Sequence, residues 1–137
     1  MKSLLTILLC VLTLSAISLG QNAAEKAAIE SANHWLSTID AGDYAASWRP
    51  AAPMFKAAVS QDQWAQMLKA TRAPLGKVIS RKVKSAVYKT SLPGAPDGKY
   101  VVIQYESSFE HKASAIETVT PMLGDDGQWR VSGYYIR

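Results

Sequence analysis

Glu117 is the residue in this sequence best suited to acid–base chemistry, because it lies in a run of β-branched residues close to the end of the chain. A carboxyl group that faces an apolar interior has a raised pKa, which suits proton transfer. Two simpler roles fit equally: an ion pair with Arg130 across a closing hairpin, or a solvated outward position. If Glu117 faces solvent or is fully engaged by an arginine, the catalytic role fails.

Three tyrosines on predicted strands, Tyr105, Tyr134 and Tyr135, could place phenol groups near that carboxylate. In an isomerase-like site such a phenol donates a hydrogen bond that polarises a carbonyl. Neighbouring residues on a strand face opposite ways, so Tyr134 and Tyr135 cannot both point into one interior. We assign no catalytic residue, and Glu117 and Tyr134 are the candidates if the protein is an enzyme. Packing, with the hydroxyl in contact with solvent, is the simpler role for each tyrosine.

Aromatic side chains on the predicted helices could line a pocket for a small apolar ligand. They are also what the core of a small domain without disulfides needs, and the sequence leaves both roles open. Arg72 and Arg81, on either side of a Pro-Leu-Gly turn, could clamp an anion, or could pair with Asp40, Asp43 or Glu106 and fasten a helix to the sheet. The candidate ligand-binding residues are Trp35, Tyr44, Trp48, Arg72, Arg81 and Tyr105.

Metal, cofactor and nucleic-acid chemistry have little support in the sequence. There are two histidines, His34 and His111, at no ligand-like spacing, and one cysteine, so we expect no metal site and no cofactor. No nucleophile elbow, phosphate loop or dinucleotide-binding glycine motif is present. Lysine and arginine are scattered, apart from Lys77 to Lys84, so no nucleic-acid partner is expected.

The first 20 residues have the pattern of a cleaved signal peptide. Lys2 precedes an apolar run that contains only threonine and serine as polar residues, and Ser18 and Gly20 are small residues at the cleavage positions. A membrane anchor is the alternative, but a run of roughly 17 uncharged residues is short for spanning. We expect a periplasmic or secreted domain, residues 21–137, with no membrane attachment after cleavage. It lacks cysteine, because Cys10 leaves with the leader.

The residues after the leader predict helices first. Apolar residues recur at helical spacing from Ala23 to Asp40, and Gly42 is suited to a left-handed cap. Asp43 is placed to cap a short helix through Trp48, and a further turn is predicted over residues 54–59. A third helix runs from Ser60 to about Thr71, where Ser60 and Gln63 have the spacing of a capping box.

Alternating strands follow the helices, with predicted ranges of 78–88, 99–109, 113–123 and 128–136. The first is expected to carry a bulge where its polar phase slips. Gly124-Asp-Asp-Gly127 is suited to a hairpin turn, since Asp-Gly supplies positive φ. Helices followed by consecutive strands predict a single α+β domain: about three helices on a curved antiparallel sheet of about four strands.

These motifs resemble those of a bacterial family known as domain of unknown function 4019, over almost the whole chain after the leader. The resemblance rests on Trp35-Leu36 with Asp40 to Trp48, Arg72 to Gly76 with Arg81, Pro93 to Tyr100, Glu117 to Pro121, and Gly127 to Tyr135. It implies the nuclear-transport-factor-2-like, or cystatin-like, superfamily, with a cone of helices laid into a strongly curved sheet. Dimerisation through the sheet is typical of that superfamily.

The resemblance implies no activity, because the family is uncharacterised. Some members of the superfamily, such as ketosteroid isomerase, are enzymes with carboxylate and tyrosine groups in the cone, and many others only bind. Three hypotheses follow. The first is an exported binding or accessory domain without catalysis, for a small apolar ligand or a protein, with a homodimer through the sheet as one partner. The others are a small lyase or isomerase, and a purely structural envelope protein.

Overall fold

The computed structural model describes residues 2–137, with side chains placed from Gly20 onward. Helix α1 (Lys2–Asp40) continues much further toward the N-terminus than the predicted start at Ala23, a stretch whose seven leucines favour helix. The side chains behind the signal-peptide prediction lie outside this description. Over the described residues, no helix is long and apolar enough to cross a membrane.

Three short helices follow the tight turn at Gly42, whose φ of 82° confirms the left-handed position. They are α2 (Tyr44–Trp48), α3 (Pro53–Ala58) and α4 (Gln61–Thr71). Ser60 and Gln63 form the predicted capping box of α4. Asp43 does precede α2, but its side chain makes no capping bond; it lies exposed beside the turn instead.

The sheet has four antiparallel strands in the order β1-β2-β3-β4, so each strand pairs with its neighbours in sequence. They are β1 (Val78–Lys89), β2 (Tyr100–Phe109), β3 (Lys112–Leu123) and β4 (Trp129–Ile136). The register shifts twice along β1, as the slip in its polar phase predicted. In the turn between β3 and β4, Gly127 has φ 79° and its N–H bonds to the Gly124 carbonyl, which confirms the predicted hairpin.

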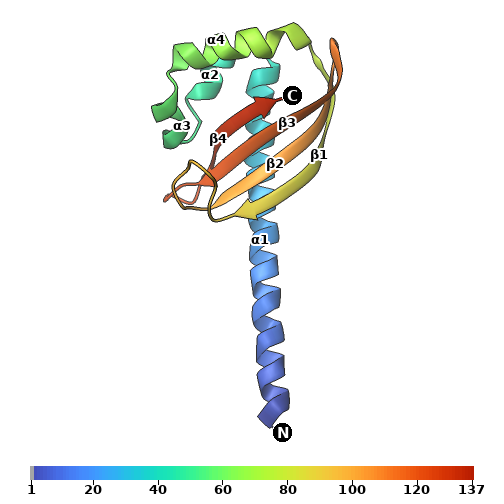
Figure 1. The fold of residues 1–137 in the computed structure, drawn as a ribbon, viewed down its shortest axis with the longest axis vertical. Helices are drawn as coiled ribbons and strands as arrows, with labels where there is room; N and C mark the ends of the chain where they lie inside the picture. Colours follow the sequence, from blue (N-terminus) through green and yellow to red (C-terminus); the bar gives the residue numbers. More distant parts are fainter. Residues whose placement is uncertain (1) are drawn as a thin grey trace.

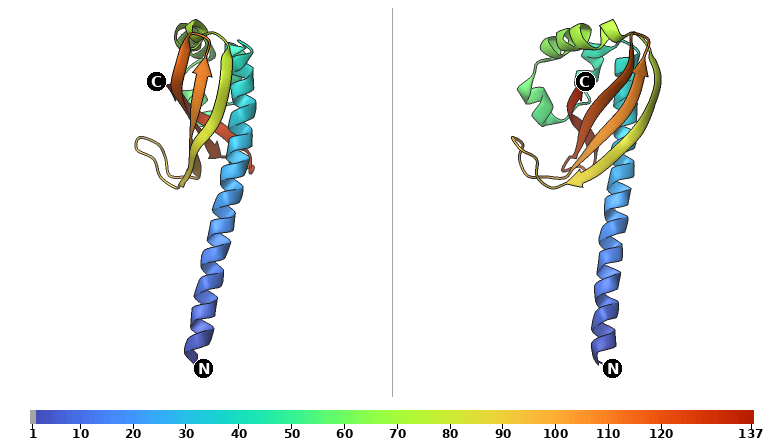
Figure 2. Two further views of the ribbon diagram at one scale, coloured as in Figure 1. Left: turned by 90° about the vertical axis from the view of Figure 1, so that its right-hand side faces the viewer. Right: turned by 45° about the vertical axis from the view of Figure 1, so that its right-hand side comes forward.

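The helices lie to one side of a twisted, curved sheet, and the two form an α+β fold as predicted (Figure 1). α1 runs along one face, which we call the inner face, and the edge-on view shows that it stays on that side (Figure 2). Buried residues of α1 and α4 meet alternate residues of β2 and β3 in a single apolar core. The core includes Leu36, Ile39, Leu68, Ile103 and Val119.

Candidate functional site

Glu117 lies on the inner face of β3 and is completely buried. Its Oε1 accepts hydrogen bonds from Arg81 Nε at 2.7 Å and from Ser107 Oγ at 2.6 Å. Its Oε2 accepts from Arg81 Nη2 at 3.2 Å and from the Tyr134 hydroxyl at 2.6 Å. A carboxylate offers about four lone-pair sites. All of them are used, so Glu117 has no free lone pair with which to take a proton from a substrate.

Arg81 reaches Glu117 by passing over the intervening strand. Arg81 of β1 lies directly opposite Ser107 of β2, and Ser107 lies opposite Ala115 of β3. These two small side chains leave room for the guanidinium to extend across β2 to the carboxylate. Ser107 also donates a hydrogen bond to that carboxylate, so a serine on the buried face of β2 is part of the site.

Asp40, the last residue of α1, binds the same guanidinium from the helix side. Arg81 donates to Asp40 from Nη1 at 2.7 Å and from Nη2 at 3.0 Å, and Arg72 donates to it at 3.3 Å. Arg81 therefore fastens α1 to the sheet through Asp40, as one of the two sequence-based alternatives predicted, whereas Arg72, the C-cap of α4, joins α4 to α1. We call Asp40, Arg72, Arg81, Ser107, Glu117 and Tyr134 the buried polar cluster.

The predicted pairing of Glu117 with Arg130 is wrong. Arg130 lies opposite Met122 in the hairpin register, whereas Ile136 lies opposite Glu117. The guanidinium of Arg130 binds Asp126 in the turn instead, at 2.6 and 2.9 Å. Of the other acids proposed as partners of the two arginines, Glu106 pairs with Lys82 and Asp43 is exposed.

The electrostatics of the buried polar cluster keep its donors protonated. Burial opposes the charge on Arg81, but hydrogen bonds from Arg81 to Asp40 and Glu117 outweigh burial and raise its pKa. Burial, together with the charge of Glu117, raises the pKa of Tyr134 well above its ordinary value. Burial likewise raises the pKa of Tyr105 to about 12, with Arg81 opposing the shift. Both phenols therefore act as hydrogen-bond donors and not as acids at neutral pH.

The predicted aromatic lining packs against itself. Trp35 stacks on Trp64 with ring centroids 6.1 Å apart, and Tyr134 meets Trp35 edge-on at 5.4 Å. Phe55 meets Trp64 edge-on at 4.8 Å. Trp35 and Trp64 are each 4% exposed, so these rings fill the space between helices and sheet and do not border an open cavity.

Indole and phenol groups in this core have protein partners. Trp35 Nε1 donates to the Ser47 carbonyl at 2.8 Å, and Trp64 Nε1 donates to the Ser47 hydroxyl at 2.8 Å. The Tyr105 hydroxyl donates to Asn33 Oδ1 at 2.8 Å. Ser47, like Ser107, is a buried hydrogen-bond partner that the sequence analysis did not identify. The only indication in the sequence is a serine at a position of a predicted helix that should be buried.

The predicted ligand-binding residues do not converge on a single hollow. Tyr44 borders an open groove of about 760 Å³ between α2 and α4. Trp35 touches a different hollow of about 250 Å³ between α1 and the hairpin of β3 and β4. Arg81 borders a third, of about 330 Å³, at the end of β1 and β2. Trp48 donates its indole N–H to the Val59 carbonyl at 2.7 Å, and Arg72 stacks on the Phe109 ring at 4.3 Å.

The prediction that the protein has no metal site can be compared only with the side chains that the structure describes. Among residues 20–137, no group of three or more histidine, cysteine, aspartate or glutamate side chains is placed to hold a metal ion. His34 and His111 are both exposed and lie on different elements, α1 and the turn between β2 and β3.

The fold and the buried polar cluster together define a small α+β domain. Its interior is packed with side chains, and buried ion pairs join its helices to its sheet. A family model described as "Protein of unknown function (DUF4019)" matches residues 31–134. That match covers most of the chain, so the protein belongs to this family, and the resemblance seen in the sequence is confirmed. The matched range contains every member of the buried polar cluster. No curated protein matches the chain.

Proposed function

We propose that this protein is an exported, non-catalytic binding domain that acts through the outer face of its sheet. The observation that supports this most strongly is the state of Glu117. The best candidate for acid–base catalysis is fully buried and receives four hydrogen bonds, two of them from an arginine. A lyase or isomerase would need this carboxylate to be accessible and free to accept a proton.

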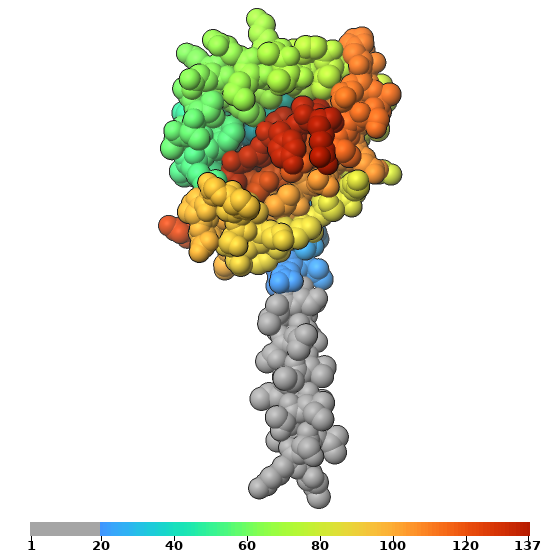
Figure 3. Space-filling model, in the orientation of Figure 1, coloured from blue at the N-terminus to red at the C-terminus, as the bar shows by residue number. Residues whose placement is uncertain are grey.

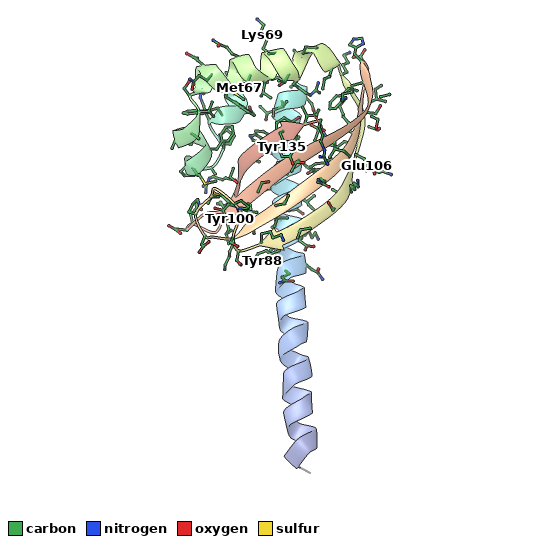
Figure 4. The ribbon with its side chains drawn as sticks, in the orientation of Figure 1. Met67, Lys69, Tyr88, Tyr100, Glu106 and Tyr135 are labelled. Atoms are coloured by element: carbon green, nitrogen blue, oxygen red, sulfur yellow. The ribbon has the colours of Figure 1, made fainter. Side chains whose placement is uncertain are left out.

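The outer face, opposite α1, offers a surface suited to contact. It is formed by alternate residues of all four strands, and Tyr135 lies on it with 55% of its surface exposed. Figure 3 shows this face uncovered by the helices, with the edge strand β4 in red near the middle of the view. In Figure 4 Tyr135 lies on β4, and Glu106 lies toward the opposite margin of the sheet. Apolar and uncharged polar residues supply most of it: Val87, Val102, Gln104, Ile116, Thr120, Met122 and Tyr135.

A second copy of the chain is the occupant we propose. The charged residues that share this face, Lys82, Lys89, Glu106 and Arg130, lie toward its margins, so two copies could meet through the uncharged residues between them without burying unpaired ions. A two-fold dimer would place the same patch on both subunits, and an exposed tyrosine is the kind of residue that dominates such contacts. Sheet-mediated dimerisation is also what the resemblance to the nuclear-transport-factor-2-like superfamily implies.

Sedimentation equilibrium over a concentration series tests this proposal. We expect a monomer–dimer equilibrium that Tyr135→Glu shifts to monomer, because a carboxylate would be buried without a partner. Met67→Glu is the matched control, since Met67 is 53% exposed on α4, away from the sheet. A monomer at every concentration, or a dimer that Tyr135→Glu leaves intact, would contradict the proposal.

A small apolar ligand is a second candidate, and the groove between α2 and α4 favours it. Tyr44 and several alanines line this groove, whose volume of about 760 Å³ is within the range of small-molecule sites. Native mass spectrometry of protein purified from its own compartment would show extra non-covalent mass. We expect Ala65→Trp, which fills the groove, to remove that mass. If no extra mass accompanies the wild-type chain, this second candidate loses its support.

A further inference from the structure

The free edge of the sheet at β1 is a second surface, which the proposed function does not use. β1 is the first strand in the order β1-β2-β3-β4, and in the part of the chain that the structure describes it pairs only with β2. Figure 1 shows β1 at the outer edge, and the left view of Figure 2 brings that edge toward the viewer. An edge strand presents unpaired N–H and C=O groups that can accept another strand.

Three exposed apolar side chains lie along this edge, Ile79, Val83 and Val87, among polar and charged residues. Val83, on the inner face, is 41% exposed, and Val87, on the outer face, is 45% exposed. Ile79, at the first register shift, is 67% exposed. A strand added beside β1 would cover apolar surface on both faces of the sheet. A partner that bound only one face would leave the apolar side chains of the other face exposed.

Two bulges limit where a strand can pair. The register of β1 shifts between Val78 and Ser80 and again between Val83 and Ser85. From Ser85 to Lys89 the pairing with β2 is unbroken, so this is the longest regular run of the edge. Val87 lies at its centre, and Lys84 and Lys89 flank it, roughly 15 Å apart along the strand.

The charges of this edge indicate the chemistry of its partner. Lys84 and Lys89 are exposed, and neither makes an ion pair with another described residue. Lys82 pairs with Glu106. If two copies met antiparallel through β1 about Val87, Lys84 of one copy and Lys89 of the other would lie one position apart along the ladder, and like charges this close are destabilising. The edge therefore disfavours a second copy and favours an acidic strand.

We propose that the edge of β1 from Lys84 to Lys89 binds an extended acidic segment of another protein by adding it to the sheet as a fifth strand. The segment would carry acidic residues about five positions apart, with β-branched residues between them. Backbone hydrogen bonds along Ser85–Lys89 would supply affinity, and the two lysines would select acidic sequences over basic or neutral ones.

A labelled octapeptide of threonine and valine, with glutamate at its second and seventh positions, is the probe. Fluorescence anisotropy measures its binding to the full chain, and amide chemical shifts map the site. We expect binding that weakens with added salt, with shifts concentrated in β1 and β2. Lys84→Glu with Lys89→Glu should weaken binding by about tenfold. The matched reversal Lys69→Glu on α4 should leave it unchanged.

Two peptide controls separate strand addition from simple charge attraction. The same octapeptide N-methylated at alternate residues loses its backbone donors, and the version with lysine in place of glutamate loses its charge complementarity. We expect neither to bind. The proposal is overturned if the acidic peptide fails to bind at about 1 mM, or if the N-methylated peptide binds as well as the parent. It is also overturned if the double variant Lys84→Glu with Lys89→Glu binds as well as the wild type, or if the amide shifts map to other strands. Circular dichroism confirms that each variant is folded.

Discussion

Replacing Arg81 by methionine should destabilise the protein severely, because it removes the centre of the buried polar cluster. Glu117 would keep only Ser107 and Tyr134 as donors, and Asp40 would lose both of its bonds from Arg81. Removing one partner of a buried ion pair costs about 3–5 kcal/mol, since the remaining charge stays buried without compensation. A domain of this size has about 5–15 kcal/mol of stability in all, so the variant should be close to unfolding.

Urea unfolding followed by tryptophan fluorescence measures the effect. The matched control is Lys82→Met, which breaks an ion pair on the same strand whose lysine is 77% exposed. Such a surface pair contributes about 0–1 kcal/mol. Combining Arg81→Met with Glu117→Gln should recover about 1–2 kcal/mol relative to Arg81→Met alone, because the amide carries no charge. Its oxygen can accept from one of the two hydroxyls, Ser107 or Tyr134, while its NH2 group donates to the other. A loss below about 1 kcal/mol for Arg81→Met would refute the argument that Glu117 is buried as a charge.

Three further predictions concern other parts of the molecule. Trp35→Ala should cost about 3–5 kcal/mol in urea unfolding, because the ring is stacked in a filled core; a loss under about 1 kcal/mol would mean that the core is not filled there. The pKa of Tyr134 is raised in the folded protein, and that of Tyr105 is raised to about 12. Both phenols therefore lose a proton more readily in the unfolded chain, so stability that is present below about pH 10 is lost as the pH rises further. Tyr134→Phe should flatten that decline when the free energy of unfolding is measured between about pH 9 and 11.5, and an unchanged slope would count against it. The hydrogen bond from Arg130 lowers the pKa of Asp126 to about 2, so the turn is stabilised above about pH 4 and loses this contribution as the pH falls toward 2. An NMR titration in which the Asp126 carboxyl carbon titrates near pH 4 would contradict this.

The strands and their order could be predicted from the sequence because alternation and turn residues are local signals. The pairing of Arg81 with Glu117 could not, because it depends on which residues face each other across β2. That alignment is set by the turns and by the bulges in β1, and a shift of one residue would send Arg81 to the other face. Ser107 was overlooked for the same reason: its importance lies in the space that it leaves for Arg81.

The ion pair of Glu117 with Arg130, one of the roles that the sequence left open for this carboxylate, shows a different limit. The turn at Gly124 to Gly127 was predicted correctly, and it sets Arg130 opposite Met122, too far along the strand from Glu117. Proximity in the sequence suggested the pair, but the hairpin register separates it. Whether the predicted aromatic residues line a pocket or fill a core was likewise beyond the sequence, because both arrangements need the same residues at the same spacing.

The buried polar cluster also has a consequence for the time course of folding. The bonds of Arg72 and Arg81 to Asp40 and Glu117 join residues 32 to 41 positions apart. These contacts require both aligned strands and a docked α1, so we expect them to form late in folding. Interactions absent from the transition state slow unfolding and leave the folding rate unchanged. The cluster would then lower the unfolding rate and so lengthen the lifetime of each folded molecule. A long-lived folded state is what resistance to proteolysis requires.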